Sequence, residues 1–224
     1  MPVLDRGLLA DDAVSGARLL VGAMLVRGTG PNARVGRIVE VEAYVGREDL
    51  ACHARFGQTK RNGVMFGRPG VAYVYLVYGM HNCLNVVAET DGKAAAVLIR
   101  AVEPVAGVGE MRRARTDLAA QRARNRGPAA VVAAVARIAA LPAWRLASGP
   151  GLVCDAYKIS RDDDGVDLCD SSSQLRLETS ANAEQLELVS GARIGIDYAP
   201  EPWRSIPWRV FAAGHRSLSR GGAA

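Results

Sequence analysis

The sequence is short of lysine. Its 28 basic residues include only Lys60, Lys93 and Lys158, so the other 25 are arginine. Arginine binds phosphate through a planar fork of donors and also stacks on bases, which a lysine ammonium cannot do. With a net charge of +5, the composition permits nucleic acid as a partner but does not establish it.

Signals for metals and cofactors are also missing. The cysteines are widely spaced without a Cys-x-x-Cys pair, and the histidines show no ligand spacing, so we expect no zinc or other metal site. The glycines at 63, 67, 70 and 79 fit neither the dinucleotide-binding nor the phosphate-loop pattern, and no cofactor is expected. The residues considered as metal ligands are Cys52, Cys83, Cys154, Cys169, His53, His81 and His215.

No apolar run approaches the length of a membrane span, and the first residues lack an apolar signal region. These absences favour a reduced, cytoplasmic protein that does not contact membranes. A chain of 224 residues with an apolar fraction of 49% fits one globular domain, which we assign to residues 1–224.

Hydrophobic spacing and turn residues predict helices alternating with a run of strands. Short turns join the central strands, which is typical of an antiparallel meander in an α+β protein. The predicted helices are 12–21, 129–141 and 152–157, and the predicted strands are 23–27, 35–45, 71–77, 83–89, 95–102, 175–178, 186–188 and 193–196.

The strand at 35–45 presents two unlike faces. One is apolar, and the other places Glu40, Glu42 and Tyr44 side by side. We expect Glu40 to lie on a solvated strand face. Glu42 is adjacent to Tyr44 in a partly enclosed setting, where burial would raise its pKa and make it a plausible general base.

Half of the six tyrosines lie at 73–78. Tyr73 and Tyr75 share a strand face and are, by default, packing residues. Tyr78 lies at the tip of the predicted hairpin, where an exposed apolar group can wedge between base steps. The arginines of 112–126 form either a solvated helix face or a surface that follows DNA phosphates.

A series of longer motifs then runs through nearly the whole chain. They are Gly36-Arg-Ile-Val-Glu-Val-Glu-Ala-Tyr44, Gln58-Thr-Lys-Arg-Asn62, Met65-Phe66, Tyr73-Val-Tyr-Leu-Val-Tyr-Gly-Met80, Leu98-Ile-Arg-Ala-Val-Glu-Pro104, Ser148-Gly-Pro-Gly-Leu-Val-Cys154 and Arg193-Ile-Gly-Ile196. In identity and order they resemble the alkyladenine (3-methyladenine) DNA glycosylase family. The resemblance implies a curved antiparallel sheet core with a protruding β-hairpin, flanked by helices.

The same resemblance implies a role for each matching residue. Glu42 would activate a water molecule that Arg100 and the backbone carbonyl of Ile194 help to hold. The remaining residues would bind the flipped base, enter the duplex or contact the DNA backbone. The base pocket would comprise Tyr44, His53, Tyr75, Asn85, Met65 and Leu98; the inserted residues would be Tyr78 and Met80; the backbone contacts would be Thr59 and Arg61.

The implied activity is that of a monomeric, monofunctional enzyme that releases alkylated purines from double-stranded DNA and leaves an abasic site. Lys60 is the one lysine near the motifs that could form a Schiff base with the sugar. Two alternatives stay open. A non-catalytic nucleic-acid-binding module would use the same sheet and arginines, and hydrolysis of an O-linked sugar would need a second, opposing carboxylate.

Overall fold

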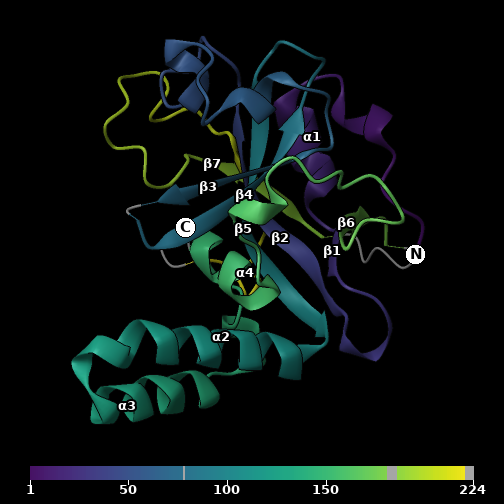
Figure 1. Ribbon diagram of the computed structural model, residues 1–224. Helices are drawn as coiled ribbons and strands as arrows, with labels where there is room; N and C mark the ends of the chain where they lie inside the picture. Colours follow the sequence, from purple (N-terminus) through teal and green to yellow (C-terminus); the bar gives the residue numbers. More distant parts are fainter. Residues whose placement is uncertain (78, 181–185, 220–224) are drawn as a thin grey trace.

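An antiparallel sheet forms the centre of the molecule, and helices lie against it and beyond one end of it (Figure 1). The computed structural model describes residues 1–77, 79–180 and 186–219. Within them the main strand order is β3-β4-β5-β2-β1-β6, and β8 pairs with both β2 and β7. The strands are β1 Met24–Arg27, β2 Arg34–Tyr44, β3 Ala72–Val77, β4 His81–Ala88, β5 Ala95–Ala106, β6 Leu175–Glu178, β7 Leu188–Gly191 and β8 Arg209–Ala212.

The long strands β2 and β5 form the central pair, and β2 changes its other neighbour along its length. Its first part pairs with β1, whereas Glu40, Val41 and Glu42 pair with β8. The register against β5 shifts between Ile38 and Val41, which marks a bulge. A bulge bends its strand and increases the local twist, so the sheet curls around the side of β2 that holds both glutamates.

The apolar face of β2 is fully buried, as its alternation predicts. Val39, Val41 and Ala43 are in the main core together with the buried side of α1 (Ala13–Leu20). That helix begins where the sequence predicts, because the side chain of Asp12 accepts hydrogen bonds from the backbone N–H groups of Val14 and Ser15. The core therefore fixes one face of β2 and leaves the other for polar contacts.

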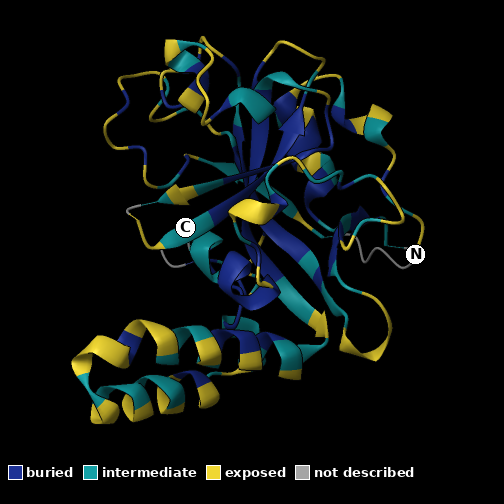
Figure 2. Ribbon diagram, in the orientation of Figure 1, coloured by how far each residue is buried: buried dark blue, intermediate teal, exposed yellow. Residues whose placement is uncertain are grey.

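Three further helices follow β5 in the chain. They are α2 (Val108–Ala123), α3 (Pro128–Ala139) and α4 (Pro150–Tyr157). The buried apolar residues of α4 belong to the same core as those of α1. The helices α2 and α3 lie side by side, and α4 packs on β4, β5 and α2. Burial follows this arrangement, since α4 is largely buried whereas α2 and α3 expose their outer sides (Figure 2).

Some predicted strands are wrong. The strand predicted at 186–188 lies instead at Leu188–Gly191, as β7. Residues 193–196 form no strand, because Arg193 is held by contacts to side chains and carbonyls distant in sequence. The strand that completes this side of the sheet is β8, which is short, fully buried and without alternation. In addition, β5 continues through Pro104 to Ala106, beyond the predicted end at residue 102.

The α+β class and the curled antiparallel sheet are confirmed. Strands β3 and β4 pair directly, with Val77 opposite His81, as expected for a hairpin. Tyr78 lies outside the described residues. Protrusion of this hairpin as a wedge therefore stays a prediction.

Gly36 offers a test of the packing between β2 and α4. A methyl group at this position would overlap the Tyr157 hydroxyl, the Val102 side chain and the Glu103 carbonyl. Overpacking of this kind costs about 1 to 3 kcal/mol, so Gly36→Ala should lower the free energy of unfolding by at least that much in urea denaturation. Gly109→Ala in α2 is the control, because open space surrounds Gly109 and alanine favours a helix. Equal stability of both variants would contradict the packing described.

Candidate active site

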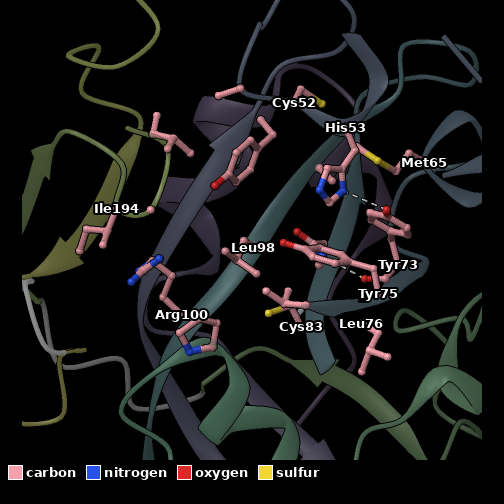
Figure 3. A pocket seen from close by; sticks show the side chains of 18 of the residues that line it. Cys52, His53, Met65, Tyr73, Tyr75, Leu76, Cys83, Leu98, Arg100 and Ile194 are labelled. Carbon is pink, nitrogen blue, oxygen red and sulfur yellow. Dashed lines mark hydrogen bonds between the residues drawn. The ribbon is translucent and has the colours of Figure 1, made fainter. Parts of the chain in front are cut away.

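A cavity of about 510 Å³ opens on the polar side of the sheet, among β2, β3, β4 and β5. Side chains from the segments 51–65 and 194–198 complete its wall. In Figure 3, Arg100 and Ile194 lie on one side of the cavity, and the rings of His53, Tyr73 and Tyr75 lie on the other. The cavity therefore has a charged side and an aromatic side.

Glu42 lies at the charged side and has no exposed surface. Its carboxylate accepts hydrogen bonds from the Tyr44 hydroxyl at 3.0 Å and from the backbone N–H of Ile194 at 2.6 Å. A guanidinium nitrogen of Arg100 lies 3.2 Å away. All three partners line the cavity, whereas Glu42 itself does not, so the carboxylate lies directly behind the wall that these partners form.

Opposing effects act on the ionisation of Glu42. Burial raises its pKa, while the positive charge of Arg100 and the hydrogen bonds from Ile194 and Tyr44 lower it. Burial is the larger effect, so the pKa of Glu42 lies above that of an ordinary glutamate. A carboxylate of this kind is a stronger base than one in water and is still held in a defined orientation.

Glu40 is not on a solvated strand face, and that expectation is wrong. It is fully buried, and its carboxylate accepts hydrogen bonds from Arg100 Nε at 3.0 Å and from the Ser219 backbone N–H at 2.7 Å. Arg209 on β8 lies 3.3 Å from the same group. The cations that permit its burial come from β5 and β8, which sequence spacing alone does not bring to β2.

The aromatic side is built from two neighbouring elements. The ring of His53 lies 4.5 Å from that of Tyr75, edge to face, and its Nδ1 is 3.0 Å from the Tyr73 hydroxyl. Although His53 is open at the cavity mouth, loss of water around its ring and the charges of Arg61 and Arg55 lower its pKa to about 4. The imidazole is therefore neutral at pH 7. Burial also raises the pKa of Tyr73 to about 12, which leaves that phenol neutral as well.

The inner end of the cavity is formed by Asn85, Met65 and Leu98, all of them buried. Asn85 faces Leu98 across β4 and β5, and its amide donates to the Tyr73 carbonyl at 3.1 Å. The structure thus brings every predicted base-binding residue to one cavity. The role of each of these residues in binding a flipped base stays a prediction.

The predicted DNA-contacting residues lie outside the deepest part of this cavity. Arg61 is at its rim, with its guanidinium 5.4 Å from the Tyr75 ring centre. Thr59 is exposed, and its hydroxyl and backbone N–H bond to the Asn62 side chain. Met80 is 63% exposed, which suits a residue that enters a duplex, and its predicted partner Tyr78 lies outside the described residues.

Sequence reasoning missed the residues that hold the Ile194 segment in place. The buried guanidinium of Arg193 forms two hydrogen bonds with Asp49, at 2.5 and 2.9 Å, and also donates to the Ala43 carbonyl. It lies 4.7 Å from the ring centre of Tyr44. The one available signal was the position of Arg193 beside Ile194 in a matching motif.

Across residues 1–77, 79–180 and 186–219, no group of three or more His, Cys, Asp or Glu side chains is placed to hold a metal ion. In the same described ranges, no helix is both long and apolar enough to cross a membrane.

Comparison with known proteins shows the family of this chain. The model of the methylpurine-DNA glycosylase family matches residues 8–216. The chain belongs to the methylpurine-DNA glycosylase family. A DNA glycosylase is a hydrolase that takes DNA as substrate, so the predicted enzyme class and DNA partner are confirmed at that level.

Proteins similar to this chain occur in several organisms. A protein of Methanocella arvoryzae is 45% identical over 91% of this chain and 92% of its own length. One of Myxococcus xanthus is 39% identical over 97% and 94% of the two chains, and one of Alkaliphilus oremlandii is 40% identical over 97% and 98%. Each is named "Putative 3-methyladenine DNA glycosylase".

The buried pair of Asp49 and Arg193 can be tested by stability. Asp49→Asn would leave the guanidinium of Arg193 without a counter-charge, and breaking a buried pair in this way costs about 3 to 5 kcal/mol. We expect a correspondingly lower free energy of unfolding in chemical denaturation. Glu201→Gln is the control, because the Glu201 and Arg204 pair is exposed and its loss should have no measurable effect. A stability loss no larger than that of the control would refute the structural role of this pair.

Proposed function

We propose that this protein is a monofunctional DNA glycosylase that flips alkylated purines, of the 3-methyladenine type, out of duplex DNA. A water molecule activated by Glu42 hydrolyses the N-glycosidic bond and leaves an abasic site. The observation that supports this most strongly is the buried Glu42 carboxylate, which is bonded to Tyr44, Arg100 and Ile194 where these three residues line an aromatic cavity.

The cavity explains why the base has to leave the duplex. Its volume of about 510 Å³ is in the range of small-molecule sites, and its walls cannot reach a base within the stack. Extrusion costs a few kcal/mol, and stacking on an aromatic ring returns about 1 to 3 kcal/mol per base. Tyr44, Tyr75 and His53 are the rings available for that stacking.

The charge state of the aromatic side favours an alkylated base. Alkylation at a purine ring nitrogen makes the base cationic, and cations bind well to the faces of electron-rich rings. Because the pKa of His53 is lowered to about 4, its imidazole does not repel such a base at pH 7. A cationic base is also a good leaving group, since it departs as a neutral molecule.

The chemical step requires one base and one nucleophile. The Glu42 carboxylate accepts a proton from water, the water oxygen bonds to the sugar carbon, and the bond electrons leave with the purine. Arg100 favours the ionised form of Glu42, and the Ile194 N–H fixes one of its oxygens. The Ile194 carbonyl is proposed to hold the same water molecule.

Strand cleavage by a lyase step requires an amine that attacks the sugar. Lys60 is exposed and is not among the residues that line the cavity. The product is therefore proposed to be an abasic site in an unbroken strand. A flipped base that carries an exocyclic amine, as normal guanine does, would be disfavoured at Asn85, which lines the cavity.

Glu42→Gln should abolish release of 3-methyladenine from duplex DNA, by at least about 100-fold in single-turnover rate, because the amide cannot accept the proton. Duplex affinity should remain. The folded pKa of Glu42 is raised, so its stabilising contribution is complete at low pH and is lost as pH rises through that pKa. The glutamine variant should thus be at least as stable as the unaltered protein at pH 7.

The matched control is Glu48→Gln, which changes an exposed carboxylate in the loop after β2. Full release by Glu42→Gln would overturn the mechanism. Affinity for undamaged RNA equal to that for damaged DNA, with Glu42 dispensable, would favour a non-catalytic binding module instead.

The pH profile provides an independent test. Only ionised Glu42 acts as base, so kcat/KM should fall as pH decreases through a pKa above about 4.3, the value for free glutamate. Tyr44→Phe keeps the ring and removes a hydrogen bond that lowers this pKa. The acidic limb should then move to higher pH. An acidic limb at the ordinary glutamate pKa, unmoved in the variant, would contradict the assignment.

A further inference from the structure

The arginines of 112–126 do not form one solvated face. Arg112 donates to three carbonyls at the end of α3, and the buried Arg115 donates to the Arg145 and Leu146 carbonyls. These two side chains stabilise the helical part of the protein. Arg122 differs from them, because it reaches the turn between β3 and β4.

Arg122 connects three elements. Its guanidinium forms two hydrogen bonds with the Asp155 carboxylate of α4, at 2.8 and 3.1 Å. It also donates to the backbone carbonyl of Met80 at 2.8 Å. Asp155 is buried, so this pair is a fixed point of α4 and not a mobile surface contact.

The residues that follow Met80 contact α4 and the segment directly after it. The His81 side chain packs closely on α4, where a Cβ at Gly151 would lie 3.0 Å from it. The Asn82 amide donates to the Ile159 carbonyl at 3.3 Å. The chain entering β4 is therefore anchored through the Met80 carbonyl and the side chains of His81 and Asn82, whereas the Met80 side chain is exposed.

We propose that Arg122 and Asp155 act as a positioning pair, which fixes the backbone of Met80 directly before β4 while the Met80 side chain enters the duplex. This inference rests on the proposed function, since it assigns the pair to base flipping. Extrusion of a base costs a few kcal/mol. An inserted residue offsets less of this cost if its backbone moves away from the duplex when it is inserted. A rigid anchor for the Met80 backbone avoids that loss.

A role in binding phosphate fits Arg122 less well. Its charge is compensated by Asp155, and both terminal nitrogens of its guanidinium already donate hydrogen bonds to protein acceptors. A surface cleft is lined by Met80, Arg122 and Asp155, and Arg126 lines it as well. Within the described ranges, Arg126 bonds to neither Met80 nor Asp155. The two arginines therefore separate the effect of anchoring from the effect of charge.

The test compares two duplexes that contain the same alkylated purine, one with a normal partner base and one with a gap opposite the lesion. A gap removes most of the pairing that has to be broken. Arg122→Gln and Asp155→Asn should each lower the single-turnover rate on the paired duplex by about tenfold, which corresponds to 1.36 kcal/mol of barrier. On the gapped duplex the loss should be less than about twofold on the same reasoning.

Matched variants complete the experiment. Arg126→Gln should weaken duplex affinity and its salt dependence while leaving the saturating rate unchanged. Arg122→Lys retains the charge without the two-pronged contact and should be intermediate. Activity on the gapped duplex shows that each variant is folded.

Equal losses on both duplexes, or no loss on either, would overturn the positioning role while leaving the proposed function intact. Absence of release by the unaltered protein from both duplexes would overturn the proposed function, and the positioning role with it.

Discussion

Arg100 lies between two buried carboxylates, and the arrangement of the site depends on it. Its Nε donates to Glu40 at 3.0 Å, and its Nη1 lies 3.2 Å from Glu42. Its third nitrogen, Nη2, donates to the Ser219 hydroxyl, and the N–H and hydroxyl of Ser219 both bond to Glu40. Strands β2 and β5 and the segment near residue 219 thus meet at one guanidinium. Without that guanidinium, both buried carboxyl groups would lose a hydrogen-bonded cation, which is costly in the protein interior.

The two glutamates have different parts in this arrangement. Glu40 accepts hydrogen bonds from Arg100, Arg209 and Ser219, and it thereby joins β2 to β5, to β8 and to the segment near residue 219. Glu42 is bonded to Tyr44, Arg100 and Ile194, which line the cavity, and burial outweighs these contacts, so its pKa is raised. A buried carboxylate with a raised pKa is a feature that is frequent at functional sites.

Much of this site is predictable from local sequence. Strand phase alone places Glu42 and Tyr44 on the face opposite the core, and the Asp12 cap fixes the start of α1. The family motifs then identify a set of residues that the structure does gather around one cavity. These inferences succeed because each depends on residues close together in the chain or on a pattern with fixed spacing.

The remainder depends on contacts between distant segments. The burial of Glu40 requires Arg209, and the position of Ile194 requires Asp49, which is 144 residues from Arg193. Likewise, an arginine-rich helix reads as a solvated face until its carbonyl and carboxylate partners are known. Short, fully buried β8 has no alternation to reveal it. Local patterns do not contain this information.

The central claim is that this protein hydrolyses the N-glycosidic bond of damaged purines at the cavity beside Glu42. A single-turnover assay on a panel of duplexes, each with one defined lesion, tests it most directly, with the free base and the strand ends measured separately. We predict release of 3-methyladenine with the strand left intact until alkali is added. No base released from any lesion duplex, or strand cleavage together with base release, would contradict the account.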